Sequence, residues 1–202
     1  MIDIEIEDPA WSLAVPDAEA LVRMAIEETL AFAFPVQGEG GPRPQGGVEG
    51  ARPVAELELA PSTPRLRRAV ALPRFAGETS LNMLLTDDAS VRDLNARFRD
   101  RDAATNVLSF PALPNPENLL GDVALAFGVC VREAAEQGKL LAHHLQHLTV
   151  HGVLHLLGHD HIGDDEAETM EGLERAVLAK LGVPDPYLVA PYLVDGGEHE
   201  RP

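Results

Sequence analysis

Cysteine is nearly absent from this chain of 202 residues, in which Cys130 is the single example. One thiol excludes an internal disulfide framework and any zinc site built from several thiolates, and it fits a reducing compartment. Basic residues are also scarce, because 16 Lys and Arg stand against 33 Asp and Glu, for a formal net charge of −17. Such a surface cannot form a uniformly basic nucleic-acid coat, so any contact with RNA or DNA must be local.

Long hydrophobic runs are missing as well. A membrane span needs roughly 18 or more consecutive apolar residues, and the chain contains no such run. Its first residues are acidic, where a secretory signal would be basic. We therefore expect a cytoplasmic protein with no membrane partner. The composition that remains, 45% hydrophobic and 24% charged, is that of an ordinary globular protein with enough apolar material for one core.

The hydrophobic pattern alternates between the period of strands and the period of helices. Predicted strands cover residues 2–6, 79–85, 106–110 and 120–127. Predicted helices cover 16–34, 129–137, 141–157 and 164–181, and a further helix with its N-cap at 86–88 carries Val91, Leu94, Asn95 and Phe98. Strands concentrate early and helices late, without regular alternation. This order predicts an α+β domain in which a small mixed β-sheet packs with about five helices.

A Gly- and Pro-rich segment interrupts this pattern. Residues 35–53 hold four prolines and six glycines, with too little apolar content to offset the entropy of ordering. The strand and helix before it are too small to form their own core. We therefore expect a single domain over 1–202 that carries a mobile insertion at about 35–76. Residues 54–59 alternate again, and they fit either an edge strand or part of the insertion.

Histidine is the residue type with the most uneven distribution, since seven of the eight histidines lie between residues 143 and 161. His151 and His155 are four residues apart on a predicted helix, which places their side chains on one face about 6 Å apart along the axis. Their neighbours are apolar, and burying unpaired imidazoles among them would be costly. These features favour a shared metal ion over two solvated side chains.

A third ligand comes within reach at the end of this helix. Glycine readily adopts the left-handed conformation of a helix C-terminus, so Gly158 allows the chain to turn back and present His159 or His161. Three neutral imidazoles suit one Zn²⁺ ion and leave its fourth tetrahedral position open, as in catalytic zinc sites. We expect a zincin-like metal-hydrolase architecture.

Other polar residues near this motif are given plainer roles. His143, His144 and His147 are expected to be solvated, because the helix rotates them off the ligand face. The acidic run over 164–174, which contains Asp164, Asp165, Glu166, Glu168, Glu171 and Glu174, is expected to form a solvated helix face. Asp160 fits either a role in orienting a ligand or water, or a cap on the turn.

Metal peptidases of the H-E-x-x-H type place a general-base glutamate directly after the first histidine. This chain has Gly152 there. The peptidase hypothesis therefore lacks its base. A structural metal would normally have four protein ligands, so a non-catalytic role is also less favoured than hydrolysis.

The segment His151-Gly-Val-Leu-His155-Leu-Leu-Gly158-His-Asp160-His161 resembles the H-G-x-L-H-L-x-G-x-D-H motif of the bacterial endoribonuclease YbeY family, also called rRNA maturation factors. A second block, Leu94-Asn-Ala-Arg-Phe-Arg99-Asp-Arg-Asp102 through Thr105-Asn-Val-Leu-Ser-Phe-Pro111, is similar to the arginine-bearing helix end of that family and its next strand. Leu120-Gly121-Asp122 is similar to the strand after it. The resemblance covers about residues 79–187.

The resemblance implies that His151, His155 and His161 hold one zinc ion, that His159 is a bystander, and that Arg99 is the functional arginine beside the cleft. It implies a single-strand-specific, metal-dependent endoribonuclease, a hydrolase of phosphodiester bonds, that acts in 16S rRNA 3′-end maturation and in ribosome quality control. The implied partners are single-stranded RNA, pre-16S rRNA and the small ribosomal subunit, and no DNA is expected. A zinc peptidase and a non-catalytic ribosome-assembly factor with a structural metal remain the alternatives.

Charge along the chain is uneven in a way that bears on RNA binding. Eight of the sixteen basic residues are Arg65, Arg67, Arg68, Arg74, Arg92, Arg97, Arg99 and Arg101. A basic strip leading toward the metal would attract an RNA backbone despite the net charge. Equally, these arginines fit a solvated or ion-paired state beside neighbouring aspartates.

Overall fold

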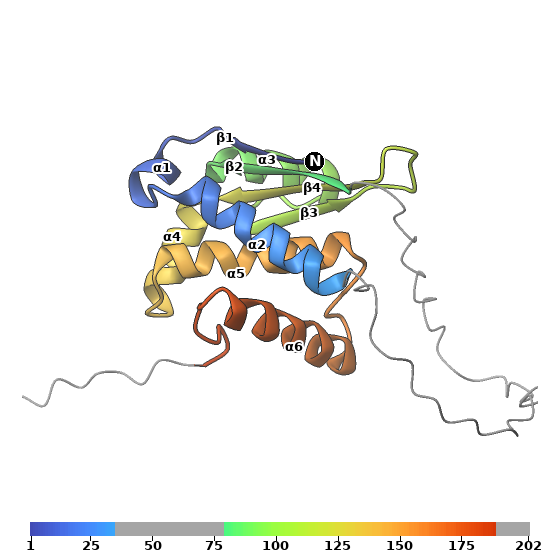
Figure 1. Cartoon of the computed structure of the whole chain (residues 1–202). Helices are drawn as coiled ribbons and strands as arrows, with labels where there is room; N and C mark the ends of the chain where they lie inside the picture. Colours follow the sequence, from blue (N-terminus) through green and yellow to red (C-terminus); the bar gives the residue numbers. More distant parts are fainter. Residues whose placement is uncertain (35–78, 189–202) are drawn as a thin grey trace, which may run out of the picture.

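A computed structural model describes residues 1–34 and 79–188 of the chain. Its sheet has four strands in the order β1-β2-β4-β3 (Figure 1). These strands are β1 (Ile2–Ile6), β2 (Ser80–Thr86), β3 (Val107–Pro111) and β4 (Leu119–Ala126). The first, second and fourth run parallel, whereas β3 pairs antiparallel with β4 at one edge. The mixed sheet expected from the sequence is thus confirmed.

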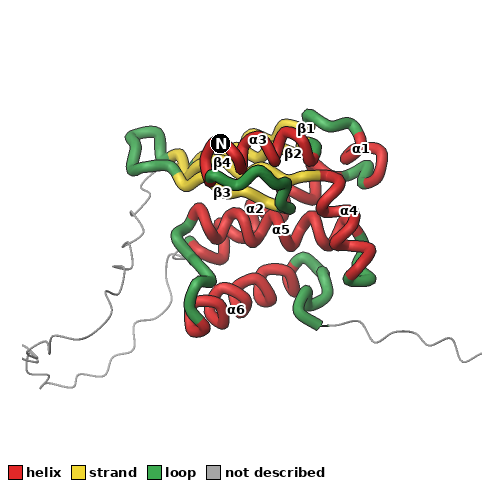
Figure 2. The backbone as a smooth tube through the Cα atoms, turned by 180° about the vertical axis from the view of Figure 1, so that it is seen from behind, coloured by secondary structure: helices red, strands yellow, loops and turns green. Residues whose placement is uncertain are grey.

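Six helices surround this sheet in the part of the chain that is described (Figure 2). They are α1 (Ala10–Ala14), α2 (Ala18–Ala33), α3 (Asp88–Arg99), α4 (Phe127–Glu136), α5 (Leu141–Leu156) and α6 (Asp164–Lys180). Five match the predicted helices to within a few residues. The sixth, α1, was not predicted, because five residues are too few to show a helical period. The α+β class is confirmed.

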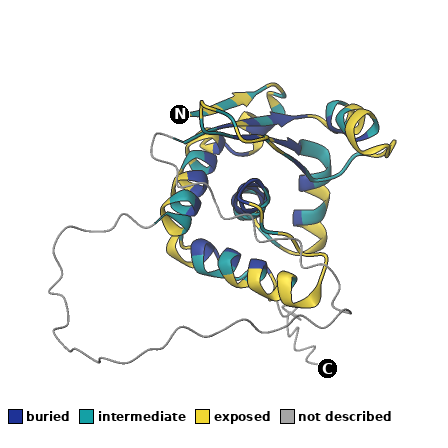
Figure 3. Ribbon diagram, turned by 90° about the vertical axis from the view of Figure 1, so that its right-hand side faces the viewer, coloured by how far each residue is buried: buried dark blue, intermediate teal, exposed yellow. Residues whose placement is uncertain are grey.

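The helix α5 lies between the sheet and the other helices on one face of the sheet. Figure 3 shows it end-on and buried. Ten of its sixteen residues are buried, so other elements cover it on most sides. Its buried residues include Leu145, Val150, Val153 and Leu154. They join one core with the sheet residues Leu81, Met83 and Leu85.

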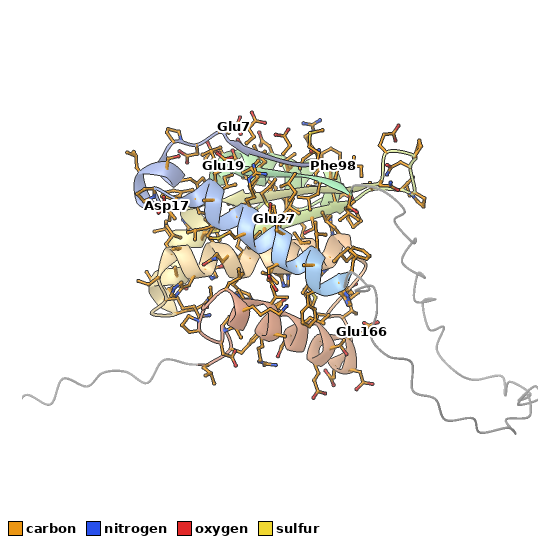
Figure 4. All side chains as sticks on the ribbon, in the orientation of Figure 1. Glu7, Asp17, Glu19, Glu27, Phe98 and Glu166 are labelled. Atoms are coloured by element: carbon orange, nitrogen blue, oxygen red, sulfur yellow. The ribbon has the colours of Figure 1, made fainter. Side chains whose placement is uncertain are left out.

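Residues outside this core follow the expected alternation. On β1 the isoleucines face the core while Asp3 and Glu5 are exposed. The outer side of α2 carries acidic side chains such as Glu19 and Glu27, labelled in Figure 4. A charged outer face and an apolar inner face are the pattern of a helix that covers a core on one side.

The opposite face of the sheet is covered by α3. A second, smaller core forms there from Val91, Leu108, Ala124 and Ala126. The helix begins as the sequence predicts, because the Asp87 carboxylate accepts a hydrogen bond of 2.7 Å from the Ser90 N–H. The helix ends at Arg99 and lies on the side of the sheet opposite α5.

Some expectations fall on residues that are not described. The Gly- and Pro-rich insertion at about 35–76, the possible strand at 54–59, and Arg65, Arg67, Arg68 and Arg74 all lie outside the described residues. Among the helices that are described, none is both long and apolar enough to cross a membrane.

Candidate metal centre

Two turns of α5 and the sharp bend after it bring the three predicted histidines together. His151 and His155 lie on one face of the last turns of α5. The helix ends in a Schellman motif, in which the N–H of His159 bonds to the Leu154 carbonyl at 3.0 Å and Gly158 has φ of +88°. This reversal returns the chain toward the helix end, so His161 faces the other two imidazoles. The predicted role of Gly158 is confirmed.

The three imidazoles are close enough to bind one ion. One ring nitrogen from each of His151, His155 and His161 lies within 4.8 Å of the other two. The Nε2 atoms of His151 and His155 are 3.1 Å apart. Two Zn–N bonds of about 2.05 Å at a tetrahedral angle would separate the nitrogens by about 3.3 Å. The group can therefore hold a metal ion after small adjustments.

Hydrogen bonds on the far side of two rings fix which nitrogen faces the centre. Nδ1 of His155 lies 3.0 Å from the His159 carbonyl oxygen, which can only accept, so this nitrogen carries the proton. Nδ1 of His151 lies 2.8 Å from a Glu174 carboxylate oxygen. Both Nε2 atoms then present lone pairs to each other. Such lone pairs repel one another unless a cation or proton lies between them, and this donor set fits a divalent metal.

Burial keeps His155 suited to ligation. Burial lowers the pKa of His155, and the neighbouring His151 and His161 lower it further. A metal ligand must be the neutral imidazole. His159, predicted to be a bystander, does not join the three-histidine group, but its backbone carbonyl orients His155.

Glu174 corrects the prediction that the whole acidic run forms a solvated face. Its side chain is 0% exposed, and its carboxylate contacts His151, His147 and the hydroxyl of Tyr187. Burial by itself would raise the pKa of this carboxyl, but hydrogen bonds from His147, His151 and Tyr187 lower it to about 2. The other members of the run behave differently: Glu166 accepts the Gly163 N–H, and Glu171 pairs with Arg175.

The prediction of solvated histidines at positions 143, 144 and 147 is wrong for two of them. His144 is 2% exposed and its Nε2 bonds to Glu133 at 2.9 Å. His147 is 15% exposed and bonds to Glu174. Both residues lie off the ligand face, as expected, but each bonds to an acidic partner on a neighbouring helix, Glu133 on α4 and Glu174 on α6. Neither residue belongs to the three-histidine group.

A cleft of about 340 Å³ opens onto the centre. Its walls include His151 and His161, together with Met170, Glu171 and Tyr187. Asp160 lies in the turn before His161, where its carboxylate accepts the His161 N–H at 2.8 Å. Of the two roles left open for Asp160, this contact supports the cap.

Arg99 lies at the end of α3 and is exposed. Its guanidinium donates a hydrogen bond of 2.8 Å to the carbonyl of Ser109 on β3. The Ser109 hydroxyl in turn donates to the Gly152 carbonyl at 3.2 Å, directly after His151 on α5. This chain of contacts links the arginine to the metal-centre helix through the edge strand.

The basic strip is in part ion-paired. Arg92 forms two hydrogen bonds with Asp102 on the protein surface. These contacts raise the pKa of Arg92 and lower that of Asp102. Exposed pairs of this kind contribute little stability. Arg97 stacks on Phe98 instead, with its guanidinium carbon 5.4 Å from the ring centroid.

Sequence reasoning missed Glu174, His147 and Tyr187 as parts of the site. A signal for Glu174 existed, because helical spacing places it on the same face as Met170, Val177 and Leu178, which are buried. One acid within an apolar stripe indicates a buried partner. Tyr187 lies beyond α6, and its spacing carries no comparable signal.

Comparison with known proteins gives concordant results. A family model described as "Endoribonuclease YbeY" matches residues 63–182. Proteins of that name from Nitrobacter winogradskyi and Pseudomonas fluorescens are 49% and 51% identical over 135 and 139 residues, which cover 60% and 66% of this chain and 71% and 91% of theirs. The one from Paramagnetospirillum magneticum is 41% identical over 194 residues, covering 92% of this chain and 94% of its own.

Among solved structures, the solution structure of TM1509 from Thermotoga maritima matches with a TM-score of 0.45 and 17% identity, over 95% of this chain and 99% of that one. The family model spans the three-histidine turn and the segment from α3 to α6, and the match to the Paramagnetospirillum magneticum protein covers 92% of this chain. The chain belongs to the endoribonuclease YbeY family.

Proposed function

We propose that this protein is a zinc-dependent endoribonuclease that cleaves single-stranded RNA. The observation that carries the proposal is the group of three imidazoles, His151, His155 and His161, of which His151 and His161 line a cleft. Three protein ligands leave a tetrahedral ion one open position, which is the arrangement of catalytic zinc. Family membership supports RNA as the substrate.

The ion, when bound, would supply Lewis-acid activation of a water molecule and of a phosphate oxygen. The residues of the chain supply the rest. His151 and His155 are oriented by hydrogen bonds on their Nδ1 atoms, so little reorganisation is needed for ligation. Arg99 is not among the residues that line the cleft and contacts the edge strand at Ser109; we propose that it contacts a phosphate of the bound RNA, because its forked donors match phosphate oxygens and remain charged.

The position of Gly152 weighs against the peptidase alternative. A Cβ at this position would lie 2.8 Å from Val123 Cγ1 and 3.3 Å from Ser109 Oγ, both on the sheet. A side chain at residue 152 would therefore enter the sheet. The general base of an H-E-x-x-H peptidase has no room at its usual place.

The cellular role we propose is processing of 16S rRNA near its 3′ end and ribosome quality control, with pre-16S rRNA and the small ribosomal subunit as partners. Membership in a family that is named for endoribonuclease activity supports this role. The phosphate backbone of single-stranded RNA needs local cations, and the exposed Arg97 and Arg99 at the end of α3 supply two of them.

The test compares four preparations on one single-stranded RNA: wild type, wild type stripped by a chelator, His155→Ala, and His143→Ala as a matched control. His143 lies on the same helix, outside the three-histidine group. Metal content is measured on each sample. We expect cleavage by wild type and by His143→Ala only, restored to the stripped enzyme by zinc, and weak or absent on duplex RNA and on DNA.

Equal cleavage by all samples would indicate a contaminating nuclease and would refute the proposal. Zinc bound at full occupancy without cleavage of free RNA or of RNA in small-subunit particles would favour the assembly-factor alternative. Hydrolysis of a casein substrate in place of RNA would favour the peptidase.

A further inference from the structure

Glu174 is a buried carboxylate at the back of the metal centre. It lies on α6, 23 residues along the chain from His151, and its side chain is 0% exposed. One oxygen is 2.8 Å from His151 Nδ1, and the other is 2.8 Å from His147 Nε2 and also contacts the Tyr187 hydroxyl. A buried acid is costly unless its charge is met by several donors. Here three donors from two other segments meet it.

The protons in this cluster can be assigned. Within the described residues, Nδ1 of His147 is buried and has no hydrogen-bond partner. A neutral imidazole carries one proton, so that proton lies on Nε2, where Glu174 accepts it. Tyr187 donates from its hydroxyl. His147 and Tyr187 both donate to Oε2 of Glu174, and two donors on one oxygen stabilise the ionised form of the carboxyl group.

The consequence reaches the ligand. An ionised Glu174 accepts the Nδ1 proton of His151, so the lone pair of His151 is on Nε2, the atom 3.1 Å from His155 Nε2. A carboxylate on the far nitrogen also makes the imidazole a stronger donor to a metal. His155 is held differently, by a neutral backbone carbonyl. The two helix ligands are thus oriented by unlike partners, and only one of those partners is charged.

We infer that Glu174 is a positioning residue for the metal centre, which fixes the orientation and donor strength of His151 and is itself held in place by His147 and Tyr187. The inference rests on the proposed ligand role of His151. The cluster extends the metal centre from the turn after α5 into α6 and the segment that carries Tyr187. Among the acids of α6, the buried Glu174 is then the one that orients a metal ligand.

Three variants separate positioning from mere support of the fold. Glu174→Gln removes the charge while keeping the shape, and its amide cannot accept from both His147 and His151. Tyr187→Phe removes one donor and keeps the ring, which packs edge-on against His147 with centroids 5.7 Å apart. Glu168→Gln removes the same charge from an exposed position of the same helix and serves as the control.

The readouts are metal affinity, measured by competition with a chromophoric chelator, and the visible spectrum of the Co²⁺-loaded protein. We expect Glu174→Gln to weaken zinc binding about 10- to 100-fold, the usual range for loss of an outer-sphere partner, and to change the Co²⁺ bands. Tyr187→Phe should show a smaller loss, and Glu168→Gln should match wild type within about twofold. Thermal unfolding of the metal-free proteins is recorded alongside.

Two results would overturn the inference. One is wild-type zinc affinity and a wild-type Co²⁺ spectrum in Glu174→Gln together with lowered thermal stability, which would leave Glu174 a structural role only. The other, available even if Glu174→Gln fails to fold, is an unchanged affinity and spectrum in Tyr187→Phe. Loss of affinity in a protein whose wild type does not cleave RNA would instead sustain the inference and refute the proposed function.

Discussion

The tight packing of α5 against the sheet at Gly152 can be tested by adding a single methyl group. Gly152 is buried, and a Cβ at this position would lie 2.8 Å from Val123 Cγ1, a distance that real Cβ atoms essentially never show. It would also lie 3.4 Å from Val107 Cγ2. Gly172 on α6 offers a matched control, since it is exposed and a Cβ there meets nothing within 4 Å.

Both Gly→Ala substitutions raise the helix propensity, but only the one at residue 152 creates a steric clash. In the interior of a helix, alanine is more favourable than glycine by about 1 kcal/mol, and this gain applies at both positions. At residue 152 the added methyl must displace a packed side chain or shift the helix, which costs about 1–3 kcal/mol. We therefore expect Gly172→Ala to stabilise the protein. Gly152→Ala should be less stable than Gly172→Ala by about 1–3 kcal/mol, because the shared helical gain cancels in the comparison.

The assay is urea unfolding of the metal-free proteins, followed by fluorescence of Trp11, the single tryptophan, which is fully buried. In thermal unfolding the same difference corresponds to a gap of roughly 3–9 °C for a chain of this size. If both substitutions stabilise the protein equally, α5 does not press on the sheet at this point. The packing account of Gly152, and the argument against a base there, would then be refuted.

Three further outcomes follow from the structure. Arg99→Ala should lower the rate of RNA cleavage about 100-fold without changing zinc affinity, while Arg97→Ala at the same helix end should lose much less; equal losses in single-turnover assays would contradict the special role of Arg99. Burial first, and then the charges of Glu133 and Asp88, raise the pKa of the Cys130 thiol, so a thiol reagent should label it only in the unfolded protein, and rapid labelling of the folded protein would contradict this placement. Burial alone would raise the pKa of Glu174, but its three donors lower it from 4.5 to about 2. This shift stabilises the folded protein above pH 4.5, and the stabilisation is lost as the pH falls toward 2. In urea unfolding at stepwise lower pH, the stability difference between wild type and Glu174→Gln should therefore shrink over that window, and a constant difference would contradict the ionised assignment.

Elements with a clear period of apolar residues could be predicted from the sequence, because that period depends only on which side of the element is buried. The alternation over β1 and the helical spacing of α5 are local patterns, and both elements form as predicted. The turn after α5 was predictable for the same reason, since Gly158 adopts the left-handed conformation that few other residues tolerate. The five residues of α1 show no period, so nothing in the sequence indicated this helix.

The part of the site that escaped prediction depends on contacts between distant segments. Glu174 follows other acids on a helix, and counting charges along α6 suggests a solvated face. The apolar residues on the same face of α6 could indicate that this acid is buried, but its partners His147 and His151 lie on a different helix, so only the packing of α5 against α6 identifies them. Gly152 illustrates the reverse case. The sequence shows that residue 152 is glycine and not the glutamate of a metal peptidase. The structure supplies the reason, because a side chain there would contact Val123 too closely.

The three candidate ligands differ in how firmly the protein holds them, and this difference follows from where each one lies. His151 and His155 project from the last turns of a helix enclosed on its sides, and each has its Nδ1 fixed by a partner. His161 is exposed and follows a glycine-containing turn. Ordering a side chain costs free energy, and most of that cost is met during folding for the two helix ligands. The remaining cost falls on His161, so ligation of a metal ion by all three residues would have to order the His161 side chain as well.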